Sequence, residues 1–445
     1  MYRALGLGVL PVLLIHACSG GHGSAPDAPD AAADATVDAA TAETGREAGI
    51  DASIPHPCTL PGSIQYTSGG MVVVPGGGTA PDLGYLQVPV GFCVHYYGTV
   101  GNARQLRFAP GGELFVASPT TTTSGGGSGG LSAVVVLPDD DHDGVADSVL
   151  TFLDNLPSTQ GLLFTGGYLY YQDATRIMRV PYASGDRAPS GASEQVADIQ
   201  VYVSDTHWPK TLDVADDGTI YVGNGGIQDD VCDPSRPFHG GILKLDGTPG
   251  GTPVAKGLRN PIAVRCARGH DRCFALELAK DFSQAPDFGR EKLIPIRQGD
   301  DWGFPCCGAP NAPYYGVQPV PDCSGVAPES AAFYVAHTPF GIDFEPGLWP
   351  APWTGNAIVT LHGAFGSWIG ARVVAIGMDP TTGLPLPGSD LDGGYTGSMT
   401  EFASGWDDGQ HAHGRPAPVA FFRDGRLFLG NDNDGTVVWI APIAL

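Results

Sequence analysis

The sequence predicts an all-β fold made from one repeating hairpin unit. From about residue 85, strands with alternating apolar residues are joined by Asp/Gly or Gly/Gly turns, and the pattern recurs at intervals of roughly 40–80 residues. Helical periodicity is nearly absent, and 65 glycines with 39 prolines argue against long helices. Because a single unit cannot bury both of its faces, the units must close into a ring, which predicts a six-bladed β-propeller with long loops.

Six copies of the unit can be placed along the chain. Four are regular and two are less regular; they span residues 105–116, 161–170, 211–222 and 419–429, and residues 262–276 and 340–376. Glycine in the turns supplies the positive φ that tight hairpins require. We expect the C-terminal strand 436–440 to share a blade with an N-terminal strand within 85–100, since this pairing closes the ring without a free edge. Residues 278–335, rich in Pro, Gly and Cys, are expected to form the largest insertion.

The N-terminal segment has the features of an export signal over residues 1–17. One positive charge is followed by a short apolar stretch and small residues before Cys18, and the stretch is too short to span a bilayer. Two interpretations stay open: a bacterial lipobox in which Cys18 is lipidated, and an ordinary secretory signal. The first, which we favour, predicts an exported protein anchored by lipid in the bacterial cell envelope, with no other membrane contact.

Residues 18–57 read as a flexible acidic linker, and residues 58–445 as the folded domain. The linker is rich in Ala, Asp, Gly, Pro and Thr and has no aromatic residue, so it cannot bury enough surface to fold. The formal net charge of the chain is −24. A nucleic-acid partner is therefore not expected, because such proteins need a basic surface.

Eight cysteines follow Cys18, an even number that predicts disulfides in an exported chain. Cys266 and Cys273 flank a short loop and are expected to pair with each other. Cys58 with Cys93 is a second expected pair. The adjacent Cys306 and Cys307 should find separate partners, with Cys323 and Cys232 as the candidates. The spacings fit no standard zinc site.

Two phrases in the middle of the chain carry the residue types of a redox site. His207 begins His-Trp-Pro-Lys-Thr-Leu, and Arg259 with Asn260 lies in Gly-Leu-Arg-Asn-Pro. A histidine titrates near neutrality and can accept a proton from an alcohol. An arginine beside an asparagine supplies fixed donors to an oxygen that gains negative charge. The structural alternative is a packed core histidine and an arginine held in an ion pair.

Together the two phrases resemble the quinoprotein glucose/sorbosone dehydrogenase family, which uses pyrroloquinoline quinone (PQQ). The resemblance covers about Phe92 to Ile443. It implies a six-bladed propeller that holds PQQ at one end of its central channel and oxidises an aldose or related sugar by hydride transfer to the quinone. It gives His207 the role of general base, and it places Arg259 and Asn260 at the quinone oxygens and the calcium side of the cofactor.

The resemblance also implies further cofactor contacts. Gln160 matches a cofactor-lining position, and Arg372 and Arg415 match basic residues that neutralise PQQ carboxylates, to which bidentate arginine is suited. A loop that begins at His362 approaches the cofactor in relatives. The alternatives are a polar turn residue for Gln160 and surface arginines for the other two.

Calcium enters the prediction at two places. The family binds its cofactor calcium partly through backbone carbonyls in a Gly-Pro-containing loop after a glutamate. Here the carbonyls are those of Leu278 and Ala279, in a run that departs from the family pattern and continues with Lys280. A separate acidic loop has oxygens at alternating positions around a glycine turn, contributed by Asp139, Asp141, Asp143 and Asp147. The loop is either a structural calcium site away from catalysis or an ordinary hairpin turn.

The leading functional interpretation is a PQQ- and calcium-dependent sugar dehydrogenase that passes electrons to an external acceptor. Two alternatives from other classes stay open. One is a propeller that binds a carbohydrate or a protein without catalysis, since propellers host many functions. The other is a calcium-dependent lactonase, in which carboxylates around a central metal activate water.

Overall fold

The computed structural model describes residues 56–444 except 79, 119–132, 157, 200–206, 228–230, 234, 237, 281–289, 309–310, 336, 365–368, 389–396, 408, 410–412 and 433. Residues 52–445 form one compact unit, separate from residues 1–51. The expected signal, the Cys18 anchor and the linker up to residue 55 lie outside the described residues.

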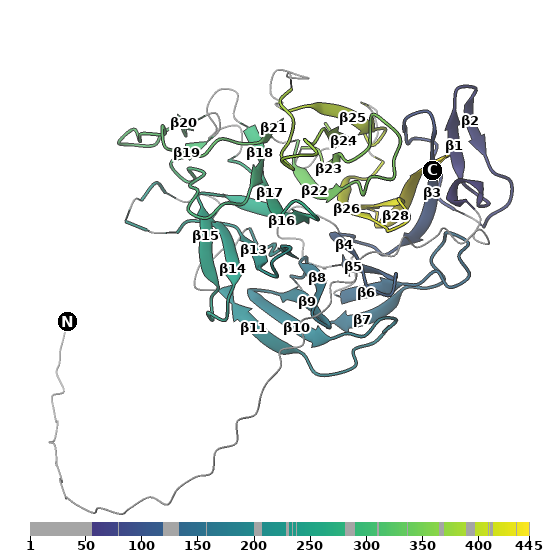
Figure 1. Cartoon of the computed structure of the whole chain (residues 1–445), viewed down its shortest axis with the longest axis horizontal. Coiled ribbons are helices and arrows are strands. Elements are labelled where there is room, and N and C mark those ends of the chain that lie inside the picture. Colours follow the sequence, from purple (N-terminus) through teal and green to yellow (C-terminus); the bar gives the residue numbers. More distant parts are fainter. Residues whose placement is uncertain are drawn as a thin grey trace, which may run out of the picture. The chain divides into compact units, whose positions relative to one another are not determined.

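The described domain is a six-bladed β-propeller, as predicted (Figure 1). Blade 1 contains β4 (Gln105–Phe108), β5 (Leu114–Ser118), β6 (Ala133–Leu137) and β7 (Leu150–Asp154). Blade 2 contains β8 (Leu162–Thr165), β9 (Tyr168–Asp173), β10 (Arg176–Pro181) and β11 (Glu194–Asp198). Blade 3 contains β12 (Leu212–Val214), β13 (Ile220–Asn224), β14 (Gly241–Leu245) and β15 (Thr252–Lys256).

The remaining blades complete the ring. Blade 4 contains β16 (Asn260–Ala267), β17 (Arg272–Leu278), β18 (Arg290–Pro295) and β21 (Ala331–Tyr334). Blade 5 contains β22 (Pro339–Phe344), β23 (Ala357–Leu361), β24 (Arg372–Ile376) and β25 (Met399–Ala403). Blade 6 contains β26 (Pro416–Phe421), β27 (Leu427–Asn431), β28 (Thr436–Pro442) and β3 (Phe92–Thr99), extended by β1 (Ile64–Thr67) and β2 (Gly70–Val73). Outside the blades lie the 3₁₀ turn η1 (Pro57–Thr59) and the hairpin of β19 (Cys307–Gly308) and β20 (Ala312–Pro313).

The repeat read from the sequence covers the first two strands of every blade, and the copy at 340–376 also covers the third strand of blade 5. The four regular copies form the inner hairpins of blades 1, 2, 3 and 6, and the less regular copies form those of blades 4 and 5. The prediction of one large insertion at 278–335 was partly wrong. This segment also supplies β18 and β21 of blade 4, whose strand pattern its Pro, Gly and Cys content hides.

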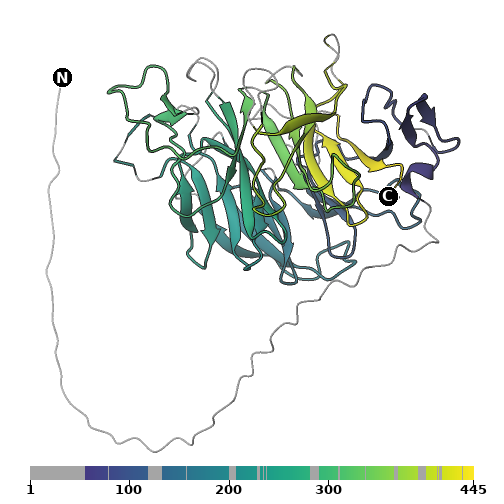
Figure 2. The same cartoon turned by 45° about the horizontal axis from the view of Figure 1, so that its top comes forward.

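The ring closes where the sequence predicted. In blade 6, β28 pairs antiparallel with β3, so that Thr436 lies opposite Thr99 and Pro442 opposite Phe92. Figure 1 shows the yellow C-terminal strands beside β3, and Figure 2 shows the same ring turned by 45°. Apolar side chains then fill the space between neighbouring blades. Trp439, for example, packs in one cluster with Val116 and Leu137 of blade 1.

We expect Trp439→Ala to lower the free energy of unfolding by about 3–5 kcal/mol, because it leaves a large cavity between blades 6 and 1. The Trp439 side chain is fully buried, stacks on His95 at a ring-centroid distance of 4.8 Å and donates its indole N–H to the Gly144 carbonyl. Urea unfolding of the purified domain measures this loss. Val320→Ala, a truncation at an exposed position, serves as the control and should change stability by less than about 0.5 kcal/mol.

The two expected disulfides are confirmed, and the partners left open for Cys306 and Cys307 are now assigned. Cys58 bonds to Cys93 and Cys266 to Cys273, and the adjacent pair resolves as Cys306 with Cys232 and Cys307 with Cys323. The Cys266–Cys273 bridge lies across the inner hairpin of blade 4, where the two residues face each other in register.

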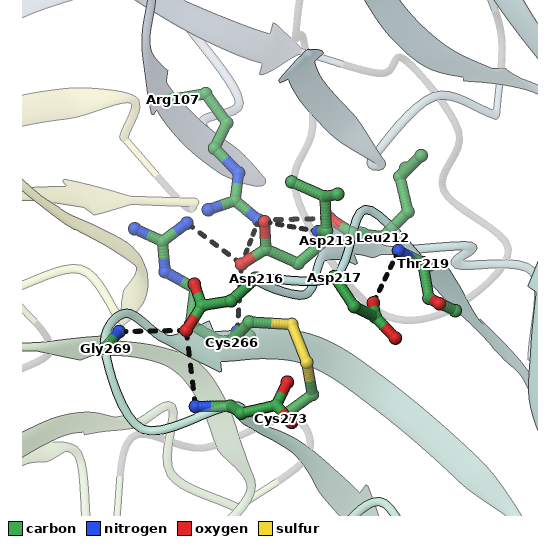
Figure 3. The surroundings of a disulfide bond; sticks show 12 residues. Arg107, Leu212, Asp213, Asp216, Asp217, Thr219, Cys266, Gly269 and Cys273 are labelled. Atoms are coloured by element: carbon green, nitrogen blue, oxygen red, sulfur yellow. Dashed lines mark hydrogen bonds and ion pairs between the residues drawn. A yellow bond between two sulfur atoms is a disulfide. The ribbon is translucent and has the colours of Figure 1, made fainter. Parts of the chain in front are cut away.

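The innermost strands contact one another in chain order around the axis, from β4 through β8, β12, β16, β22 and β26 back to β4. Each runs from the same end of the axis, so the residues before these strands gather at one end, which we call the entry end. At the opposite end Asp213 is buried between Arg107 at 3.6 Å and Arg265 at 3.3 Å (Figure 3). Arg265 also binds Asp343 at 2.8 Å, so ion pairs tie blades 1, 3, 4 and 5 across the axis there.

Candidate functional site

The entry end brings together the side chains that the two sequence phrases predicted. His207 precedes β12, Arg259 precedes β16, and Gln160 precedes β8, in three consecutive blades. The turn after β13, which contains Gly225, fits between the segments of His207 and Arg259. A Cβ added at Gly225 would lie 2.4 Å from the His207 Cβ and 3.1 Å from the Arg259 carbonyl oxygen, so only glycine allows this close approach.

His207 is buried, and a backbone contact orients its ring. Nδ1 lies 2.7 Å from the carbonyl oxygen of Gly226, whose own N–H donates to the Arg259 carbonyl at 2.7 Å. A carbonyl oxygen only accepts hydrogen bonds, so Nδ1 carries a proton, and in the neutral imidazole Nε2 is the nitrogen with the lone pair. This tautomer suits a group that must accept a proton.

Arg259 and Asn260 are both buried at the start of blade 4. The Arg259 backbone N–H donates to Glu277 at 2.9 Å, and its guanidinium donates to the Ala279 carbonyl at 2.9 Å. Glu277 is neutralised in turn by Lys292, whose Nζ lies 3.0 Å away. A fully buried ion pair thus fixes the strand end that presents Arg259.

Gln160 lies beside this pair and reaches toward the first strand of blade 4. Its Nε2 donates to the Ile262 carbonyl at 3.4 Å, and it lines an axial cavity together with Arg104, Thr211 and Phe340. Among the described residues, the side-chain oxygens of Gln160 and Asn260 are buried with no hydrogen-bond partner in the protein. Buried polar atoms are rarely left in this state, so both indicate a place for a polar ligand or for water.

A second buried cluster at the entry end was missed by the sequence analysis, apart from Arg415 and His362. Arg104, which precedes β4, binds Asp432 at 2.5 Å, and His362 Nε2 lies 2.6 Å from the same carboxylate. The Arg104 guanidinium also lies 4.5 Å from the ring centroid of Phe340 and 5.8 Å from that of Trp208. Arg104 therefore joins this cluster to the His207 segment.

Charge coupling sets the protonation of this second cluster. Burial opposes ionisation of Asp432, but the neighbouring His362, Arg104 and Arg415 outweigh it and lower the pKa of the carboxyl group. Burial lowers the pKa of His362 to about 4. The imidazole is thus neutral at pH 7 and donates its Nε2 hydrogen to the Asp432 carboxylate.

We expect this histidine to make the domain less stable in mild acid. Its folded pKa of about 4 lies below the unfolded value of 6.5, so the unfolded chain binds the extra proton as the pH falls from 6.5 to 4. Between pH 8 and pH 5 the loss should be about 2 kcal/mol. Urea midpoints across this range should show a shallower slope for His362→Gln than for the wild type, and equal slopes would contradict the assignment.

Arg415 lies at the entry end, where its guanidinium donates to backbone carbonyls. Nε donates to the His362 carbonyl at 2.9 Å and Nη2 to that of Gly363 at 2.9 Å, and burial lowers the pKa of the guanidinium to about 10. Arg372 is not brought to this cluster. It begins the third strand of blade 5, away from the axis, and its guanidinium lies 3.8 Å from Glu401 of the outermost strand.

The carbonyls expected to hold calcium are in a cationic setting. The Ala279 carbonyl already accepts the Arg259 guanidinium, and Lys280 is buried with Nζ 4.8 Å from the ring centroid of Tyr314. With Glu277 neutralised by Lys292, the charges next to Leu278 and Ala279 do not fit a divalent cation.

The acidic loop lies elsewhere, between β6 and β7 of blade 1 at the end of the axis opposite His207. Ligand oxygens of Asp139, Asp141 and Asp143 lie within 4.8 Å of one another, whereas the Asp147 carboxylate accepts the Asp140 N–H at 2.7 Å. Burial raises the pKa of Asp139 to about 6, with a smaller contribution from Asp143. The calcium interpretation of this loop stays a prediction.

Comparison with known proteins supports the fold. A family described as a domain of unknown function (DUF7133) matches residues 82–261. No curated protein matches the chain by sequence. In the described part of the chain, no helix has the length and apolar character to cross a membrane.

Several solved structures share the architecture over most of their length. A Trichoderma reesei carbohydrate-active enzyme of family AA12 is 18% identical with a TM-score of 0.65, over 82% of this chain and 100% of that one. The PQQ domain of pyranose dehydrogenase from Coprinopsis cinerea is 15% identical (TM-score 0.61, 80% and 97%). The PQQ-bound aldose sugar dehydrogenase from Streptomyces coelicolor is 17% identical (TM-score 0.52, 80% and 99%). The chain shares its propeller fold with these three proteins.

Proposed function

We propose that this chain oxidises an aldose or related sugar with PQQ as the hydride acceptor and His207 as the general base. The observation that carries the proposal is the meeting of His207, Arg259, Asn260 and Gln160, from three blades, at one end of the axis. The likeness in fold to PQQ-bound sugar dehydrogenases supports the same assignment.

The charges at the entry end fit a tricarboxylate such as PQQ. Among the described residues, the cations there include Arg104, Arg259, Lys280 and Arg415, while the carboxylates Asp432 and Glu277 are each already paired. This excess of positive charge occurs in a chain of net charge −24. Arginine and buried lysine are suited to bind carboxylates, and the open oxygens of Gln160 and Asn260 can accept from a polar ring system.

PQQ would supply an acceptor for a hydride and its two electrons. The protein supplies the rest of the chemistry. Nε2 of His207 accepts the proton of the sugar hydroxyl, which makes loss of hydride from the same carbon easier. The Arg259 guanidinium and the Asn260 amide would lie at the quinone oxygens of the cofactor, where their donors would stabilise negative charge. The electrons would leave through an external acceptor.

Calcium dependence rests on the resemblance alone. Cation binding at the carbonyls of Leu278 and Ala279 would have to displace the Arg259 guanidinium, which donates to the Ala279 carbonyl.

Export and lipid attachment at Cys18 belong to the same proposal. The four disulfides support an oxidising compartment. Cys18→Ala should release the protein from membranes if Cys18 is the anchor.

Addition of PQQ to the purified apo-protein, with and without Ca²⁺, followed by dye reduction with a panel of aldoses, tests the proposal. Saturable dye reduction that requires both PQQ and a sugar is the expected result. Sugar binding without turnover would instead indicate a carbohydrate-binding propeller. Acid release from lactones that depends on calcium but not on PQQ would indicate a lactonase, and either outcome would overturn the proposal.

A further inference from the structure

Gln172 of β9 has a fully buried side chain with all of its hydrogen-bonding capacity used. Its Oε1 accepts the backbone N–H of Gln160 at 3.1 Å and that of Lys210 at 3.0 Å. Its Nε2 donates to the carbonyls of Trp208 at 2.7 Å and Ala174 at 2.9 Å. One amide thus joins the segment before β8 to the segment before β12, in two different blades.

The segment from His207 to Thr211 needs such a partner, because it precedes β12 and lies outside the sheet ladder. Pro209 in its middle has no N–H to donate. Gln172 binds the backbone on both sides of this proline. Lys210 adds a local contact, since its buried Nζ donates to the His207 carbonyl at 3.2 Å.

The chemistry of the contacts selects a carboxamide. Two backbone donors meet Oε1 and two backbone acceptors meet Nε2, so a carboxylate at this position would face two carbonyl oxygens without a hydrogen to give. An apolar side chain of the same size would leave all four backbone groups without this partner, and three of the four hydrogen bonds lost are buried.

We propose that Gln172 is a positioning residue that fixes the distance between His207 and Gln160, an inference that rests on the proposed function. Its amide binds the backbone of Gln160 and the backbone of Trp208 and Lys210, which follow His207 in the chain. Because a displacement of about 1 Å can cost roughly 100-fold in rate, loss of this link should reduce turnover.

The test compares Gln172→Glu with the wild type in PQQ-dependent dye reduction across pH. At pH 8 we expect kcat to fall by about 10–100-fold, with a smaller change in KM. Burial should raise the pKa of the introduced carboxyl group. As the pH falls, its protonation restores a donor to the Trp208 carbonyl, so the ratio of variant to wild-type kcat should rise. A ratio that does not change with pH would overturn the proposal.

Glu345→Gln provides the matched control. The Glu345 carboxylate is also buried and accepts four backbone N–H groups, from Gly347, Leu348, Trp349 and Gly355, beyond the far end of β22. The Glu345→Gln substitution should lower the melting temperature without changing kcat or its pH profile. An equal loss of kcat in this control would show that the loss of any buried side chain with several backbone hydrogen bonds has the same effect, and it would contradict a specific role for Gln172.

Hydrogen exchange of the apo-protein separates this inference from the proposed function. In Gln172→Asn, which keeps the amide but shortens its reach, peptides covering 158–162 and 207–212 should exchange faster, and those covering 343–356 should not. Unchanged exchange at both segments would overturn the link even if the wild type is active. Faster exchange in a wild type that oxidises no sugar would support the link and refute the proposed function.

Discussion

Replacing His207 by alanine should lower kcat for PQQ-dependent sugar oxidation by about 10²–10⁴-fold, the range that a general base contributes. The ring is fixed through Nδ1 to the Gly226 carbonyl, which leaves Nε2 as the proton acceptor. His207→Asn should lose a similar factor, because its amide can still donate to that carbonyl but cannot accept the proton. Steady-state dye reduction measures both variants.

The affinity for PQQ provides the control for this experiment. Quenching of tryptophan fluorescence by PQQ should give nearly the same dissociation constant for His207→Ala as for the wild type. His270→Ala, at an exposed turn of blade 4, should leave kcat unchanged. A His207→Ala enzyme within tenfold of wild-type kcat would remove the histidine from the proton transfer.

Asp432→Asn should produce the largest loss of stability at the entry end, about 3–5 kcal/mol of unfolding free energy, because it leaves buried cations without their counter-charge. Asp432 is 1% exposed, and its carboxylate contacts both the Arg104 guanidinium and the His362 imidazole. The nearby Arg415 also helps to lower the pKa of this carboxyl group. Urea unfolding at pH 7.5 measures the change.

Asp424→Asn is the matched control for this substitution. Asp424 pairs with Arg426 at 2.8 Å, but its side chain is 36% exposed, and such surface pairs contribute about 0–1 kcal/mol. Equal losses for the two variants would show that the Arg104–Asp432 pair is not the anchor of this cluster.

The fold could be predicted because each blade repeats the same local signals. Alternating strands and glycine turns mark the inner hairpins, whose formation depends on residues near one another in the chain. Blade 4 was only half recognised, since β18 and β21 lie among proline, glycine and cysteine residues.

The site was predictable only in part, because its pairs come from distant repeats. His207 and Arg259 lie in short phrases that stand out, whereas Arg104 and its partner Asp432 are 328 residues apart. One signal was available but unused: the second strand of several blades has a buried polar residue at its last or next-to-last position. These residues are Ser118, Gln172, Asn224, Glu277 and Asn431. Buried polar residues that recur near this end of the second strand indicate the functional end of the ring.

Single-turnover reduction of the bound quinone tests the central claim most directly, because it does not depend on the electron acceptor. Apo-protein loaded with one equivalent of PQQ under anaerobic conditions is mixed with an aldose, and the quinone absorbance is followed. The account predicts a rapid loss of the oxidised spectrum in the wild type and a much slower one in His207→Ala. An oxidised spectrum that persists with every sugar tested, despite saturable binding of PQQ, would contradict it.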